Sequence, residues 1–190
     1  MTDMVETFRD AHGHRTQSFD FDIGDWDVSR VTNMYSMFRG AYAFNADIGG
    51  WDVSSVTNMY GLFFYAWAFN QDIGGWDVSQ VTDMYYAFYD ARVFDADIGA
   101  WDVSKVTTMY GTFALAVEFN QPIGDWDVSS VTTMYGMFTS ASAFNADLRL
   151  WDVSQVTNMG LMFQNSALGG SSLRAEKAPW YYPTCIAATC

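Results

Sequence analysis

Cysteine, histidine and basic residues are scarce in this chain of 190 residues. The two cysteines, Cys185 and Cys190, both lie in the tail, where they allow either a small disulfide loop, which would imply an oxidising compartment, or two free thiols. The two histidines, His12 and His14, lack further ligands at the spacing of a metal site. They therefore predict a polar loop, and we expect neither a bound metal nor a cofactor.

Basic residues are also few, with 9 basic against 22 acidic residues and a net charge of -13. This balance argues against nucleic acid or an anionic membrane surface as the partner. It favours a cationic partner or divalent cations, or else serves only solubility. No run approaches the roughly 20 apolar residues that span a bilayer. No secretory signal is visible at the N-terminus either, so we expect an intracellular protein or a mature or trimmed chain.

A block of the form Trp-Asp-Val-Ser-x-Val-Thr-x-Met dominates what is present. It occurs six times, always 25 residues apart, at Trp26, Trp51, Trp76, Trp101, Trp126 and Trp151. A fixed period of this size is typical of a solenoid, in which each repeat buries its apolar side only against its neighbours.

Within one repeat, Ile48, Trp51, Val53 and Val56 follow the spacing of a leucine-rich repeat. The alternation of Trp51 and Val53 predicts a short strand with one buried face. The spacing then changes to steps of four, three and three. The residues at these steps are Met59, Phe63, Ala66 and Phe69. These steps place the four residues on one side of a short helix.

The predicted fold is therefore an α/β solenoid, a leucine-rich-repeat-like right-handed coil. A parallel sheet of short strands would form one face, and short helices would form the other. We expect an N-terminal cap with a half coil and an insertion over 1–18, the repeats over 19–165, and a C-terminal cap or tail over 166–190.

Details at the two ends support this division. Met4, Phe8 and Ala11 match one half of a repeat, and five extra residues follow at 12–16. At the other end the regular pattern stops after Phe163. We predict that the aromatic residues of the tail cover the last coil. These are Trp180, Tyr181 and Tyr182.

The run from Ala66 to Met84, Ala-x-x-Phe-Asn-x-Asp-Ile-x-x-Trp-Asp-Val-Ser-x-Val-Thr-x-Met, resembles the BspA-like leucine-rich-repeat surface proteins. The resemblance covers about residues 4 to 165. It implies a surface-exposed or secreted module that acts in adhesion and binding, with no catalytic residues.

Stacking would turn each polar repeat position into a column. The aspartates form one column: Asp27, Asp52, Asp77, Asp102, Asp127 and Asp152. It predicts either a strip for cations or a series of turns in which each carboxylate binds backbone N–H groups, and uniformity favours the turns. The serine and threonine columns allow ice binding, although capping of the predicted helices explains the threonines. A ladder of Asn45, Asn70, Asp95, Asn120 and Asn145 is expected to bond the backbone of the adjacent coil.

Positions that vary between repeats are more informative about function, because every repeat has the same structural needs. On the outward side of the predicted helices, the middle repeats concentrate large apolar side chains. They are Phe64, Tyr65, Trp67, Tyr86, Tyr89, Leu115 and Val117. These seven residues, named the aromatic strip, predict an exposed interaction site, or else partial burial in grooves between neighbouring helices.

We therefore expect a protein that is not an enzyme, because no nucleophile, base and stabiliser are brought together. The leading hypothesis is a protein-binding or adhesion-type module whose aromatic strip docks a partner protein, another copy or an apolar ligand. The alternative is an architectural subunit of a larger intracellular or organellar assembly. Ice binding is a third hypothesis.

Overall fold

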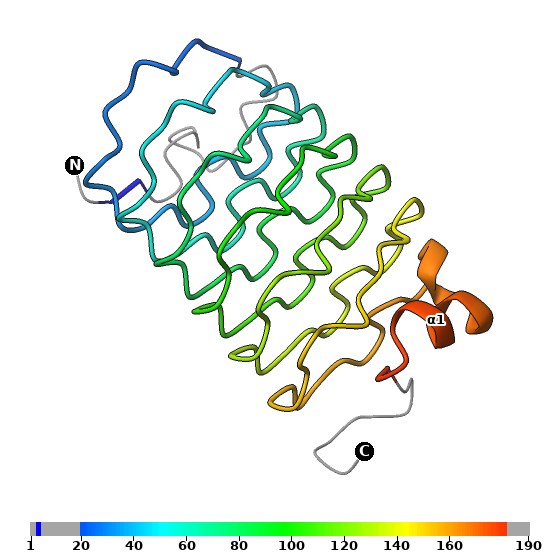
Figure 1. Cartoon of the computed structure of the whole chain (residues 1–190). Helices are drawn as coiled ribbons and strands as arrows, with labels where there is room; N and C mark the ends of the chain where they lie inside the picture. The colour runs from blue at the N-terminus through cyan, green and yellow to red at the C-terminus, as the bar shows by residue number, and fades with distance from the viewer. Residues whose placement is uncertain (1–2, 5–19, 182–190) are drawn as a thin grey trace.

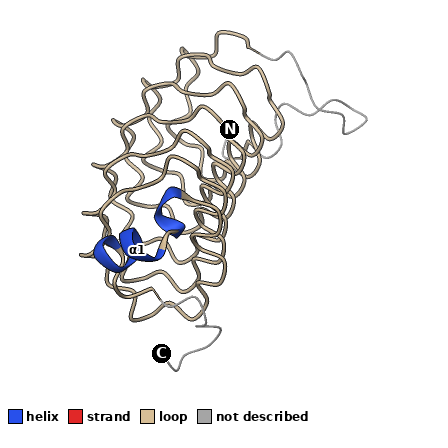
Figure 2. Ribbon diagram, turned by 90° about the vertical axis from the view of Figure 1, so that its right-hand side faces the viewer, coloured by secondary structure: helices blue, strands red, loops and turns tan. Residues whose placement is uncertain are grey.

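The computed structural model describes residues 3–4 and 20–181. Helical structure in these residues is limited to the 3-10 helix η1 (Ala167–Gly169) and the α-helix α1 (Ser171–Lys177), which both follow the repeats. The described residues form no strand or sheet, only isolated parallel bridges (Figure 2). The predicted α/β solenoid, with a parallel sheet on one face and helices on the other, is therefore wrong.

The repeats instead form loops without helix or strand, and these loops lie side by side (Figure 1). Each 25-residue loop is called a winding below. A single parallel bridge joins each winding to the next, always at the same repeat position. The bridged residues are Asn33, Asn58, Asp83, Thr108, Thr133 and Asn158. Because the position is constant, equivalent side chains of successive windings form columns.

Backbone hydrogen bonds explain why the predicted helix at 59–66 does not form. From Met59 to Tyr65, the odd-numbered N–H groups donate to carbonyl oxygens of the next winding over 2.7–2.9 Å. The N–H groups of the even-numbered residues 62, 64 and 66 donate to carbonyls three residues earlier. Gly61 and Tyr65 have φ values of 59° and 61°, which a right-handed helix excludes. Since an α-helix requires N–H groups to donate to carbonyls four residues earlier, bonding between windings replaces it.

The apolar columns form the core, as the repeat pattern predicts. Trp51, Val53 and Phe63 are almost completely buried. The rings of Trp51 and Trp76 are stacked with centroids 6.5 Å apart, and Trp76 Nε1 donates to the carbonyl of Ile48 over 3.1 Å. Tryptophan suits this column because its large ring is buried while its one polar group stays satisfied.

Contacts at the two ends agree with the sequence pattern. Asp3 is bridged to Asn33, which is five positions more than the 25-residue repeat, as the insertion requires. The insertion itself lies outside the described residues. At the other end Trp180 stacks on Trp151, with centroids 6.1 Å apart, and donates to the carbonyl of Leu148 over 2.9 Å. Tyr181 contacts Phe163, as predicted, while Tyr182 lies outside the described residues.

Candidate binding surface

The aspartate column serves the turns. The carboxylate of Asp52 accepts the Ser54 hydroxyl over 2.6 Å and the Ser54 N–H over 3.1 Å. The hydrogen bond from the serine hydroxyl, followed by that from the backbone, holds the pKa of Asp52 below its usual value. The corresponding donors lower the pKa of the other five aspartates. Each carboxylate is thus stabilised within its own winding, which supports the interpretation as turns.

The asparagine column bonds adjacent windings, as predicted. The side-chain oxygen of Asn45 accepts the N–H of Asn70 over 2.8 Å, and Asn120 accepts that of Asn145 over 2.7 Å. Asn45 and Asn70 are themselves exposed. Asn145 Oδ1 is buried and has no hydrogen-bond partner within the described structure. The column therefore ends there with an unsatisfied acceptor.

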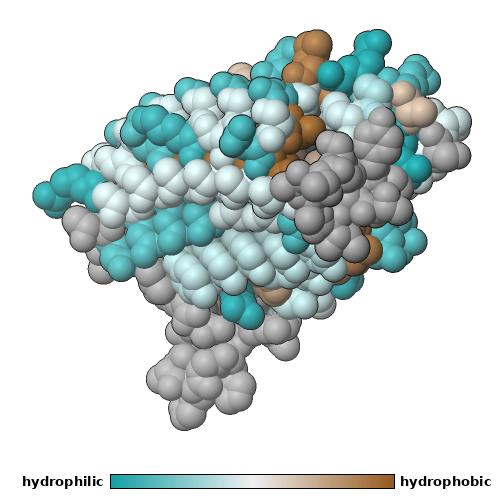
Figure 3. Space-filling view, turned by 90° about the horizontal axis from the view of Figure 1, so that it is seen from below, coloured by the Kyte–Doolittle hydropathy of each residue, from teal (hydrophilic) through white to brown (hydrophobic). Residues whose placement is uncertain are grey.

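The threonine column also connects windings. Thr82 donates both its N–H, over 2.9 Å, and its hydroxyl, over 3.2 Å, to the carbonyl of Thr57. The predicted capping role is wrong because no helix follows these threonines. Regular columns of this kind give the surface its parallel rows of similar hydropathy (Figure 3). Ice binding by the hydroxyl columns stays a prediction.

Within the described residues, no group of three or more His, Cys, Asp or Glu side chains is arranged to hold a metal ion. His12, His14, Cys185 and Cys190 lie outside those residues. The helices of the described part are too short and too polar to cross a membrane. Attention therefore turns to the aromatic strip.

All seven residues of the aromatic strip are half-buried. They lie on turns, so the prediction that they lie on the outward side of helices is wrong. Ring contacts divide the strip into two parts. One part is an aromatic cluster made of Phe64, Tyr65, Tyr86 and Tyr89, and the other surrounds Trp67.

The aromatic cluster is held together by interlocking rings. Phe64 stacks on Tyr89, with centroids 4.8 Å apart and planes at 9°. Tyr65 and Tyr86 meet Phe64 edge-on, at 4.3 and 5.6 Å. Such contacts account for the partial burial, and part of each side chain stays open to solvent. The partial burial is thus confirmed, although between turns instead of helices, and an interaction site stays a prediction.

Strained backbone distinguishes three residues of the strip. Tyr65, Tyr86 and Leu115 have φ values of 61°, 55° and 62°. In other windings, the same two repeat positions carry mostly glycine or short polar side chains. Those residues are Ser36, Gly40, Gly61, Asp90, Gly111, Gly136, Ser140 and Asn165. Large residues in this conformation are rare because the Cβ crowds the following carbonyl, at a cost of roughly 1–2 kcal/mol each.

The ring of Tyr86 occupies space that Gly111 leaves open in the next winding. A Cβ atom placed on Gly111 would lie far inside van der Waals contact with the Tyr86 ring. At Gly136 the nearest obstacle to a Cβ is only Thr139 Oγ1, at 3.3 Å. The position of Tyr86 therefore depends on glycine at 111 specifically.

A column of tyrosines runs beside the cluster, and the sequence analysis missed it. The rings of Tyr35, Tyr60, Tyr85, Tyr110 and Tyr135 stack with successive centroids 4.7, 4.7, 4.7 and 4.9 Å apart. Recurrence of tyrosine after each repeated methionine was the signal that could have revealed it. The column ends at Gly160, which takes the place of the next tyrosine.

An apolar groove of about 190 Å³ lies where the cluster and the column meet. Rings of Tyr86, Tyr89, Tyr110 and Tyr135 line it, and its remaining lining is small or aliphatic. That lining consists of Gly111, Ala114, Leu115, Gly136, Thr139 and Leu161. No charged side chain is among the lining residues. Mostly apolar concave surfaces with a few polar groups are typical of ligand sites.

The hydroxyls of Tyr86, Tyr89 and Tyr110 at the groove stay protonated over the ordinary pH range. Burial raises the pKa of Tyr86 far above its usual value, and neighbouring Tyr85 and Tyr110 add to the effect. Burial also raises the pKa of Tyr89 and Tyr110. Neutral hydroxyls can both donate and accept hydrogen bonds, so the groove offers polar contacts without charge.

Trp67 belongs to the second part of the strip. Its ring contacts Tyr42, with centroids 4.1 Å apart, and the guanidinium of Arg92 lies 4.1 Å from its centroid. Trp67 Nε1 donates to Asp90 over 2.7 Å, and Arg92 also pairs with Asp90 over 3.1 Å. Val117 follows at the same repeat position as Trp67 and is half-buried.

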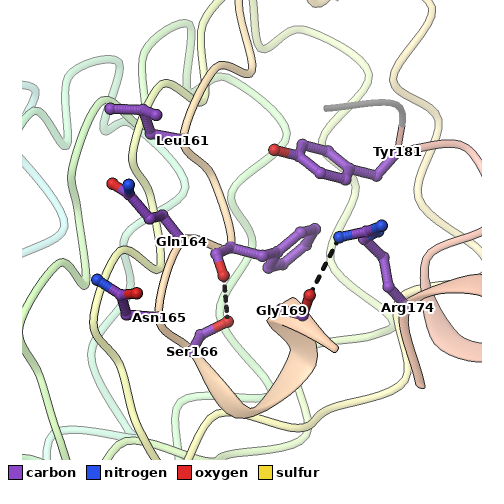
Figure 4. Close-up of a pocket in the computed structure, with 8 residues that line it drawn as sticks. Leu161, Gln164, Asn165, Ser166, Gly169, Arg174 and Tyr181 are labelled. Atoms are coloured by element: carbon purple, nitrogen blue, oxygen red, sulfur yellow. Dashed lines mark hydrogen bonds between the residues drawn. The ribbon is translucent and has the colours of Figure 1, made fainter. Parts of the chain in front are cut away.

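A larger pocket of about 430 Å³ lies beside η1 and α1 at the C-terminal end (Figure 4). Arg174 is held there by donation to the carbonyl of Gly169 over 3.1 Å. The side chains of Gln164 and Asn165 point away from Arg174. Since its polar groups do not converge, this pocket is a weaker candidate than the tyrosine-lined groove.

A family described as "Mycoplasma protein of unknown function, DUF285" matches the chain over residues 2–116 and again over residues 93–171. It is in general a BspA-like repeat family, so the resemblance seen in the repeats holds at that level. No curated protein and no solved structure is significantly similar to the chain.

Proposed function

We propose, from the premise that the chain belongs to the DUF285 family of Mycoplasma proteins of unknown function, that it is a non-catalytic protein-binding module. Its partner docks on the aromatic strip and the adjoining groove. The resemblance to BspA-like leucine-rich-repeat surface proteins supports an adhesion-type role at the cell surface or after secretion.

One observation carries the proposal. Tyr65, Tyr86 and Leu115 occupy left-handed backbone positions where the fold elsewhere accepts glycine, serine, aspartate or asparagine, with Leu161 as the one other large residue among those described. Each large residue adds strain, and strain of this kind gathers at functional sites. Requirements of folding are the same in all windings, so they do not explain why three of the four large residues at these positions lie in the middle windings. A requirement for an apolar contact surface does explain them.

The strip also has the composition of a binding surface. Tyrosine, tryptophan and arginine are the residues that most often dominate interface energies, because they offer large rigid contact areas. Tyr86, Tyr89 and Trp67 supply the rings, and Arg92 is already seated on Trp67. Interlocking fixes these rings before binding, which reduces the entropy lost on association.

Replacement of strip residues tests the proposal. A variant with Phe64→Ser, Tyr65→Ser and Trp67→Ser should lose association with its partner while it still folds cooperatively, although the lost ring contacts lower its melting temperature. The matched control carries Val93→Ser and Leu150→Ser, which remove exposed apolar side chains outside the strip.

Pull-down from the source cell would measure partner binding, and light scattering after size-exclusion chromatography would measure self-association. The control should bind like the wild type. The proposal is wrong if the control loses binding equally. It is also wrong if the strip substitutions only unfold the protein and change the binding of no partner.

A further inference from the structure

A stack of side chains crosses three windings and then stops at the groove. The guanidinium of Arg39 lies 4.8 Å from the ring centroid of Phe64, and Phe64 stacks on Tyr89 at 4.8 Å. At the next two windings this column holds only Ala114 and Thr139, both of which line the groove. The groove is therefore the place where one further planar group would continue the stack beyond Tyr89.

The size of the groove suits one large side chain. Its volume of about 190 Å³ equals that of roughly six water molecules at ~30 Å³ each. The methyl group of Ala114 leaves the far side of Tyr89 bordering this space. A flat group entering there would meet Tyr89, Tyr110 and Tyr135, which all line the groove.

The charge of the chain indicates which kind of planar group the groove would bind. The chain has a net charge of -13, and no basic residue that the structure describes lines the groove. Twice in the same strip an aromatic ring already carries a guanidinium, in the pairs Arg39–Phe64 and Arg92–Trp67. The planar, weakly hydrated guanidinium stacks well on aromatic rings.

We infer that the groove accepts an arginine side chain of the partner protein, stacked on Tyr89 as Arg39 is stacked on Phe64. This inference rests on the proposed function and specifies the chemistry of the partner. Neutral tyrosine hydroxyls at the rim would accept hydrogen bonds from the guanidinium N–H groups.

Titration with short peptides tests the inference. The probes are fluorescent Gly/Ser hexapeptides that carry two central arginines, two citrullines or two tyrosines. Citrulline keeps the shape of arginine but lacks its charge. The full chain should bind the arginine peptide at least about fivefold more tightly than the citrulline peptide, as a cation–π contact predicts.

Two variants separate the groove from general attraction to an acidic protein. Ala114→Phe extends the stack by one ring and fills the groove. It should still fold, because Phe64 and Tyr89 occupy the same repeat position. Val93→Phe is the matched control, since it adds the same ring at an exposed position outside the aromatic strip.

The arginine peptide should bind Ala114→Phe about fivefold or more weakly, and Val93→Phe like the wild type. Equal binding by all three proteins would overturn the inference and indicate diffuse charge attraction. Tighter binding of the tyrosine peptide would overturn it in favour of an aromatic guest. If no peptide binds but the strip variant still loses its partner, the inference fails while the proposed function stands.

Discussion

The dependence of Tyr86 on Gly111 gives a sharp prediction about stability. Both Gly111 and Gly136 have a left-handed backbone, with φ values of 57° and 62°. Alanine at either position should cost roughly 1–2 kcal/mol for that conformation. At Gly111 alone, the new Cβ atom also collides with the Tyr86 ring, and such overpacking adds about 1–3 kcal/mol.

Gly111→Ala should therefore destabilise the protein by about 2–5 kcal/mol, and Gly136→Ala by about 1–2 kcal/mol. The collision should disappear in a Tyr86→Ser background, because serine occurs at the same repeat position in Ser36, with a φ of 53°. A double-mutant cycle between Gly111→Ala and Tyr86→Ser should thus give a coupling of about 1–3 kcal/mol.

Urea unfolding followed by tryptophan fluorescence would measure the four free energies of unfolding, with m-values compared between variants. Equal costs at the two glycines would refute the packing of Tyr86 described above. A coupling below about 0.5 kcal/mol, which is the usual limit of additivity, would refute it as well.

Three further outcomes follow from contacts elsewhere. Asn120→Ala leaves the N–H of Asn145 without its acceptor and should cost about 1–2 kcal/mol in urea unfolding. Asn145→Ala should be neutral, because its Oδ1 has no partner in the described structure. Equal costs for the two variants would contradict this expectation. Trp180→Ala exposes Trp151 and should lower the calorimetric melting temperature, by an amount equivalent to about 2–4 kcal/mol, so an unchanged melt would count against a capping role. The Ser104 hydroxyl and backbone N–H lower the pKa of Asp102 in the folded state. The ionised Asp102 therefore stabilises the fold above the unfolded-state pKa of about 3.9, and this stabilisation is lost as the pH falls through the lower pKa of the folded state. Asp102→Asn should accordingly lose less stability than the wild type below about pH 4, and parallel pH profiles would argue against this bond.

Burial could be predicted from the repeat, but backbone conformation could not. The sequence placed Trp51, Val53 and Phe63 in the core, and all three are buried. The steps of four and three residues also indicated a helix, because three-residue turns and helical turns bury similar positions. Glycine within that segment, at Gly61 and Gly111, was the sign against a helix that the pattern of apolar residues concealed.

The candidate site was only partly visible in the sequence. Variation between repeats singled out Phe64, Tyr86 and the rest of the aromatic strip. It did not reveal the tyrosine column, since Tyr110 and its equivalents are uniform and so resembled the structural positions. The separation of Trp67 from the cluster depends on where Arg92 and Asp90 lie, which spacing alone does not indicate.

The sequence by itself determined the 25-residue register, the columns that the register creates, and which side chains are buried. These follow from identity of residues at a fixed period. Only the tertiary structure decided where the backbone N–H groups donate, because residues of one winding can bond either among themselves or to the next. That choice removes the helices, sets the left-handed residues at Tyr65, Tyr86 and Leu115, and opens the groove between the tyrosines.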